Sequence, residues 1–209
     1  MKTYSFNCCL LLKTYITMRK LKVILMIALS TWALQACNST EKDSTETADS
    51  LNMEKDTSMS GPGIAVVEDD AKFVVEAANG GMSEVEFGKL AQQKATNAKV
   101  KEFAEMMVMD HTKANEELKA LAKAKNVTLP DSLNADSKKM WEDLSKKSGA
   151  DFDKAYVNMM VDDHKKDVGE FEDASKNLKD ADLKAFVDKT LPVLKGHLDK
   201  ITAISNGMK

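Results

Sequence analysis

The strongest constraint on the fold is an apolar pattern that returns every three or four residues along the chain. Between residues 98 and 125 its members are Val100, Phe103, Ala104, Met107, His111, Ala114, Leu118 and Leu121. This spacing places the side chains on one face of an α-helix that packs against other helices. Similar seams over residues 70–95, 152–177 and 181–205 predict three more long helices. The sequence therefore predicts an all-α, antiparallel four-helix bundle.

Other features refine this bundle. Pro130 ends the second long helix, and the amphipathic stretch 135–147 predicts an extra short helix between the second and third long ones. The pair Gly80–Gly81 inside the first helix predicts either a kink or the close approach of a partner helix. Pro192 inside the last helix predicts a kink or a break.

Composition excludes some classes of protein. The 209 residues carry a formal net charge of -3, and their lysines and arginines form no basic patch. A nucleic-acid partner is therefore not expected. All three cysteines lie within the first 37 residues, so no disulfide can cross-link the bundle.

The N-terminal stretch has the pattern of a targeting signal. A basic start at Met18 precedes an apolar run over residues 23–33 and then Leu34-Gln35-Ala36-Cys37. This ending resembles a bacterial lipobox, which predicts a signal peptide over residues 1–37, a true start at Met18 and a lipid on Cys37. The protein would then be bound to a membrane of the cell envelope, facing the periplasm or in the outer membrane. An uncleaved transmembrane anchor is the alternative, although the run is shorter than the ~20 residues of a span.

The next segment is polar and has few apolar residues. Residues 38–66 are rich in Ser, Thr, Asp, Glu and Lys, and include Gly61-Pro62-Gly63. Such a composition predicts a disordered tether between the anchor and the bundle domain, which we place at residues 67–206.

A short repeat links two of the predicted helices. Residues 106–113 read Met-Met-Val-Met-Asp-His-Thr-Lys, and residues 159–166 read Met-Met-Val-Asp-Asp-His-Lys-Lys, with six of eight positions identical. His111 and His164 occupy the same place in the repeat, and His197 lies on the last predicted helix. All three are seam positions. If the helices reverse near residues 96 and 179, the height offset is only ~5 Å within each antiparallel pair, Glu84 with His111 and His164 with His197. All four side chains are therefore expected at similar heights near the middle of the bundle.

This layer has two interpretations. Three imidazoles and a carboxylate can satisfy one another's hydrogen bonds as a polar core layer. They can also bind a transition metal such as Cu, Fe or Zn, because neutral imidazole is a common metal ligand. Met107 and Met160 lie one turn before two of the histidines, where they can supply soft sulfur ligands or fill the core. Asp110 and Asp163 are expected at the helix edges, where they orient their neighbours.

Other chemistry has less support. The residues three places before the histidines are Val108, Val161 and Leu194, which argues against the Glu-x-x-His pattern of di-iron proteins. The predicted bundle has no free thiol and no Gly-rich phosphate loop. We therefore predict no catalytic residues.

Several segments together resemble a known family. They are residues 73–95, which include Gly-Met-Ser-Glu-Val-Glu-Phe-Gly-Lys-Leu-Ala at 81–91, residues 107–111, residues 149–156, the stretch around His164, and Leu-Pro-Val-Leu-Lys-Gly-His-Leu at 191–198. They are similar to the bacterial domain of unknown function 4142 family. The resemblance implies a ferritin-like bundle that is exported or membrane-associated, often described as an outer-membrane protein. The family's acidic and histidine positions correspond to Glu84, His111, His164 and His197, and no reaction is established for it.

Three functions follow as hypotheses. The first is a non-enzymatic binding or stress-related module of the cell envelope. The second is a metal-binding protein, with or without redox activity, that uses Glu84 and the three histidines. The third is a scaffold for an unidentified protein partner.

Overall fold

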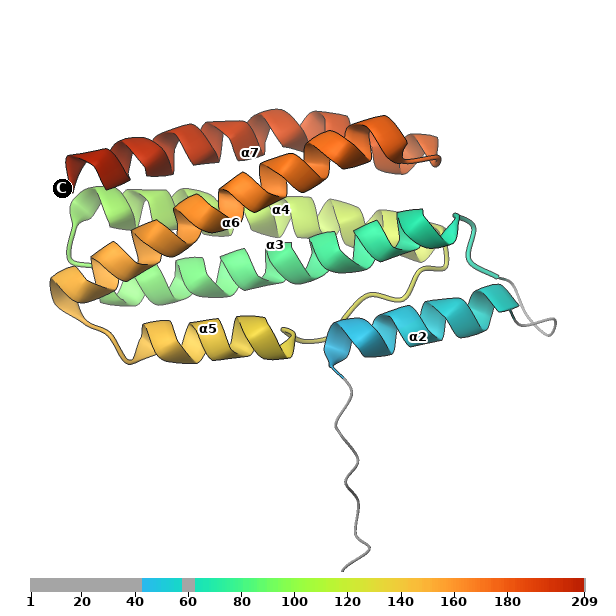
Figure 1. Ribbon diagram of the computed structural model, residues 1–209, viewed down its shortest axis with the longest axis horizontal. Helices are drawn as coiled ribbons and strands as arrows, with labels where there is room; N and C mark the ends of the chain where they lie inside the picture. The colour runs from blue at the N-terminus through green and yellow to red at the C-terminus, as the bar shows by residue number, and fades with distance from the viewer. Residues whose placement is uncertain (1–42, 58–62, 209) are drawn as a thin grey trace, which may run out of the picture. The chain divides into compact units, whose positions relative to one another are not determined.

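The computed structural model describes residues 43–57 and 63–208, and these are helical without any strand. The helices are α2 (Ser44–Thr57), α3 (Glu68–Lys94), α4 (Ala98–Ala124), α5 (Ala135–Ser145), α6 (Gly149–Asn177) and α7 (Ala181–Gly207). Four long helices run lengthwise beside one another, and the short α5 lies between the second and third of them in the chain (Figure 1). The predicted fold class is therefore confirmed. The predicted signal peptide and Cys37 lie outside the described residues.

The bundle is built from two helical hairpins. α3 packs mainly on α4, and α6 packs mainly on α7. Each hairpin turn is held by an aspartate of the other hairpin. The carboxylate of Asp153 on α6 accepts hydrogen bonds from the backbone N–H groups of Thr96 and Asn97, and Asp70 on α3 does the same for Lys179 and Asp180.

Because Asp70 and Asp153 make the same kind of contact from the first helix of each hairpin, α3 is equivalent to α6, and α4 is equivalent to α7. The sequence repeat instead falls on α4 and α6, which are not equivalent positions in the fold. The repeat therefore does not follow the symmetry of the hairpins.

Two apolar clusters fill the interior. Phe87, Phe103, Phe152 and Tyr156 are central to one, and Val74, Leu118, Leu183 and Phe186 to the other. The histidines fall between these clusters along their helices. On α4, for example, His111 lies between Met107 of the first cluster and Leu118 of the second. A polar layer thus separates two apolar halves of the core.

Glycines let α3 approach α4 closely. A methyl group added at Gly81 would collide with the side chain of Asn115, and one added at Gly88 would lie 2.8 Å from Cγ2 of Val108. The close approach expected at Gly80–Gly81 therefore occurs at Gly81, whereas Gly80 has no atom within 4 Å of an added methyl. α7 continues through Pro192 without the break that was one of the two expectations.

The prediction of a disordered tether is wrong for residues 44–57, which form α2. The physical reason is polar docking rather than apolar burial. The Asn52 side chain donates to the carbonyl of Thr128 and accepts from its N–H, and the Lys55 ammonium donates to the carbonyl of Asn126. Asp43, just before α2, accepts a hydrogen bond from Ala135 N–H at the start of α5. These bonds offset ordering entropy that the apolar content of the segment could not offset.

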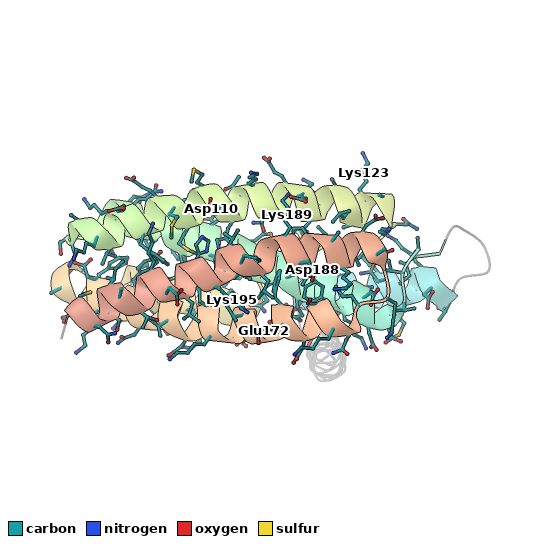
Figure 2. The ribbon with its side chains drawn as sticks, turned by 90° about the horizontal axis from the view of Figure 1, so that it is seen from above. Asp110, Lys123, Glu172, Asp188, Lys189 and Lys195 are labelled. Atoms are coloured by element: carbon teal, nitrogen blue, oxygen red, sulfur yellow. The ribbon has the colours of Figure 1, made fainter. Side chains whose placement is uncertain are left out.

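Ion pairs join the outer faces of neighbouring helices. Lys189 of α7 pairs with Glu117 of α4 at 2.6 Å, and Lys195 of α7 pairs with Glu172 of α6 at 2.7 Å (Figure 2). These exposed pairs contribute little stability each. Across residues 43–57 and 63–208, none of the helices has the length and apolarity needed to span a bilayer.

Candidate metal centre

Three helices bring their histidines together in the middle of the bundle. The ring centroids of His111 (α4), His164 (α6) and His197 (α7) lie 6.0, 5.3 and 5.5 Å apart, and the residues are 5%, 0% and 3% exposed. The expectation that the three rings converge in a dry layer is therefore confirmed. Phe103 packs edge-on against His164 and His197, which closes the layer on the side of the first apolar cluster.

One nitrogen of each ring is held by a hydrogen-bond acceptor. His111 Nδ1 lies 2.7 Å from Glu84 Oε2, His164 Nδ1 lies 2.9 Å from the carbonyl oxygen of Met160, and His197 Nε2 lies 3.0 Å from Asp110 Oδ2. These contacts are satisfied when each of the three nitrogens carries the hydrogen and donates it. They orient each ring, and with hydrogen on these three nitrogens the other nitrogen of each ring keeps its lone pair.

The remaining ring nitrogens have no hydrogen-bond partner. Within the described residues, His111 Nε2, His164 Nε2 and His197 Nδ1 are buried and unsatisfied. Burial lowers the pKa of His111 to about 4 and that of His164 to about 3, and it also lowers the pKa of His197. The imidazoles are therefore neutral at pH 7 and keep a free lone pair on these nitrogens.

The arrangement fits a metal ion. One ligand nitrogen from each histidine can be chosen so that all three lie within 4.8 Å of one another. The centre of such a triangle is at most ~2.8 Å from each nitrogen, and a bond to Zn or Cu is about 2.0–2.1 Å. Small side-chain movements would close the difference. Acceptors on the far ring nitrogens are the usual outer support of metal-bound histidines.

Glu84 connects the cluster to a second carboxyl group. It is 4% exposed, its Oε1 lies 3.5 Å from His164 Nε2, and its carboxyl group lies close to that of Asp167 on α6. Burial raises the pKa of Glu84 to about 8 and that of Asp167 to about 9. Glu84 follows Asp70 by 14 residues, and Asp167 follows Asp153 by 14, so the two carboxyls occupy equivalent places on α3 and α6.

The other predicted site residues have different environments. Met107 and Met160 are fully buried in the first apolar cluster. Asp110 lies at the surface of α4 beside α7, with its side chain 31% exposed, and holds His197 (Figure 2). Asp163 is half-buried, and burial raises its pKa to about 6.

Asp167 is the site residue that sequence reasoning did not select. The seam of the third long helix could be drawn through residue 167 or 168, and the helical period alone does not choose between them. The equal 14-residue spacing of Asp70 and Glu84 and of Asp153 and Asp167 could have indicated Asp167. Using it requires knowing that Asp70 and Asp153 hold the hairpin turns.

Comparisons with known proteins agree with this fold. The bundle is similar to a crystal structure of a DUF305 fragment from Deinococcus radiodurans, with a TM-score of 0.60 and 8% identity over 68% of this chain and 97% of that one. It is also similar to CopM in its Cu(II)-bound form, with a TM-score of 0.58 and 14% identity over 67% of this chain and 97% of the other. The Cu(I)-bound form of CopM gives a TM-score of 0.57 and 15% identity, covering 66% of this chain and 96% of that chain.

No curated protein sequence matches the chain significantly. The model of one protein family matches residues 55–204, which is most of the chain and includes all four residues of the histidine layer. The chain therefore belongs to the family described as domain of unknown function DUF4142.

Proposed function

We propose that this protein binds a transition-metal ion through His111, His164 and His197. The observation that carries the proposal is that three neighbouring rings, with centroids 5.3–6.0 Å apart, each have one nitrogen held and one buried nitrogen without a partner. A metal-free polar layer would leave three buried acceptors unsatisfied, which costs free energy for each of them. A bound cation satisfies all three at once.

Copper is the first metal to test. Imidazole binds Cu, Zn, Fe and Ni, so the ligand set alone does not choose among them. CopM, whose copper-bound forms share this bundle, supports the choice by fold. Glu84 contacts His111 Nδ1 and so supports this ligand from outside. Met107 and Met160 have packing roles in this proposal.

The decisive experiment measures metal binding by protein that carries no affinity tag. Stripped protein should bind one equivalent of Cu or Zn, and the metal should raise the melting temperature. Ligand present at 1,000 times its dissociation constant adds about 4 kcal/mol to the free energy of unfolding. The single substitutions His111→Gln, His164→Gln and His197→Gln should each remove most of this shift.

A control separates this site from surface binding. Met109 is 65% exposed and offers a thioether to copper outside the bundle, so Met109→Leu should leave the melting shift unchanged. The absence of any shift with Cu, Zn and Fe would refute the proposal. A shift that persists in all three glutamine variants would do the same.

We also propose that the metal-binding bundle acts in the cell envelope, attached to a membrane through lipid on Cys37. The basic, apolar and Leu-Gln-Ala-Cys order of residues 18–37 supports this placement. A metal-binding module on a membrane surface would serve to hold or buffer metal outside the cytoplasm.

A further inference from the structure

A pocket opens beside the histidine layer and reaches His111, one of its three rings. Its volume is about 720 Å³, within the range of small-molecule sites. It lies among α3, α4, α6 and α7, and its lining includes residues near the start of α3 and the end of α6 as well as Glu84, His111 and Asp167. α3 contacts α6 much less than it contacts α4, which leaves room for this space.

The outer part of the pocket is aromatic. Phe73, Phe171 and Phe186 all line it, and they form a continuous group with ring centroids 5.4 and 6.4 Å apart. Phe171 lies one helical turn after Asp167 on α6, so the aromatic group begins about 6 Å along the helix from the carboxyl pair. An apolar body of a few carbon atoms would span this distance.

The charge of the lining favours a cation. Seven carboxyl side chains line the pocket and only three lysines do. Two of these lysines already have carboxylate partners, since Lys72 pairs with Glu68 and Lys166 pairs with Glu170. Aromatic faces also attract cations, through the negative potential above the ring.

The carboxyl pair at the inner end lacks a positive partner. The carboxyl groups of Glu84 and Asp167 lie close together, and no lysine or arginine of the described residues forms an ion pair with either. An ammonium group between the pair and the aromatic rings would provide the missing charge and three hydrogen-bond donors.

We propose that this pocket binds a primary alkylammonium compound, with the ammonium group at Asp167 and Glu84 and the apolar body against Phe73, Phe171 and Phe186. A hydrated metal ion would gain nothing from the aromatic lining, and a carboxylate ligand would be repelled by the acidic one. The proposal does not require a bound metal, although the two sites share Glu84, which also contacts His111.

A matched series of probes tests the proposal by calorimetry on metal-stripped full-length protein. Hexylammonium, hexanol and hexanoate share one chain and differ only in the charge of the head group. We expect hexylammonium to bind at least tenfold more tightly than hexanol and hexanoate to give no binding. Equal affinity for hexylammonium and hexanol, or tighter binding of hexanoate, would overturn the proposal.

Variants locate the bound probe. Ala77→Phe places a ring inside the pocket and should abolish binding of hexylammonium. Asp167→Asn should weaken it at least tenfold, whereas Asp162→Asn, on the same helix with its side chain 82% exposed, should not change it. Unchanged binding in Ala77→Phe would place the probe elsewhere and refute the assignment. His197→Gln changes a proposed metal ligand that does not line the pocket, so it should preserve the binding of hexylammonium, which separates this result from any failure of the metal proposal.

Discussion

Glu84 gives the buried layer a distinctive dependence on pH. Its pKa is raised from an ordinary value of 4.5 to about 8 because burial penalises the carboxylate. The folded protein therefore holds a proton that the unfolded chain releases, and stability falls as pH rises from about 4.5 to 8. The isosteric change Glu84→Gln should remove the part of this stability loss that Glu84 causes in metal-free protein. The difference in melting temperature, variant minus wild type, should therefore be larger at pH 8 than at pH 5.

The histidines act in the opposite direction and provide an internal check. The pKa of His111 is lowered from 6.5 to about 4, so its contribution is present above pH 6.5 and is lost as pH falls toward 4. Both wild type and Glu84→Gln should therefore lose stability below pH 6. Glu86→Gln, which alters an exposed carboxylate of the same helix, should melt with the wild-type pH profile. Identical profiles for wild type and Glu84→Gln would show that the buried carboxyl is not protonated.

Asp110 should control metal affinity without touching the metal. It accepts the hydrogen bond of His197 Nε2 at 3.0 Å and so orients the ring. Loss of such outer support commonly costs about 10–100-fold in metal affinity. Asp110→Ala should therefore weaken binding by roughly that factor in a competition titration with a chelator. Asp162→Ala, at a solvent-facing position, is the matched control, and equal affinities for wild type and Asp110→Ala would contradict this role.

At the residue scale, the sequence predicted that the three histidines and Glu84 lie at one height, but it did not predict all of the contacts between these side chains. Seam spacing placed the three histidines and Glu84 at one height because the helical rise is fixed and both hairpin turns are short. Asp110 was expected at a helix edge as an orienting residue, and it does hold His197. The proximity of Glu84 and Asp167 depends instead on how α3 and α6, which are not consecutive in the chain, cross each other. Helical periodicity alone does not predict this crossing.

At the scale of elements, two glycines of α3 offer a matched test of helix packing. Gly80 has open space around an added methyl group, whereas Gly88 faces Cγ2 of Val108 at 2.8 Å and the carbonyl oxygen of Ala104 at 3.2 Å. Alanine is favoured over glycine inside a helix by about 1 kcal/mol. Gly80→Ala should therefore raise the free energy of unfolding by up to about 1 kcal/mol. Gly88→Ala should lower it, because α3 and α4 must separate slightly.

Chemical denaturation of the two variants measures this difference. Similar stabilisation by both substitutions would mean that α3 and α4 are less closely packed at Gly88 than the structure indicates. The sequence predicted a close approach in this helix from Gly80–Gly81, but it could not distinguish the glycine that faces α4 from the one that faces open space. That distinction depends on the rotation of α3 about its own axis.

The helix α2 shows where composition fails as a guide. Its residues are polar, so the expectation of disorder followed from a lack of apolar surface. The helix docks through side-chain bonds to backbone groups of residues 126–132, such as that from Ser44 Oγ to the carbonyl of Ser132. Such bonds leave no periodic signal in the sequence, because they depend on the shape of a loop about 70 to 90 residues away.

At the scale of the whole molecule, the residues that stabilise the bundle lie in different places from those proposed to bind ligands. The two apolar clusters and the aspartate-held turns lie on either side of the histidine layer and do not depend on it. Such a scaffold can carry unsatisfied nitrogens and buried carboxyls in its middle, since those costs are offset by packing toward both ends. Polar groups held ready for a ligand are therefore compatible with a stable metal-free fold.

Attachment to a membrane is the last prediction and concerns the whole chain. In a bacterial host that processes lipoproteins, radiolabelled fatty acid should enter the wild-type protein, and Cys37→Ala should abolish this labelling because no other residue would offer a thiol at a new N-terminus. Cys9→Ala should keep the label, since residues 1–17 precede the expected start. A lipid anchor with more than one acyl chain holds a protein firmly in the membrane. If Cys37 carries such an anchor, the wild-type protein should also resist extraction from membranes by alkaline carbonate. Equal labelling of the wild type and Cys37→Ala would show that Leu34-Gln35-Ala36-Cys37 is not a lipidation signal and would leave the bundle without its proposed anchor.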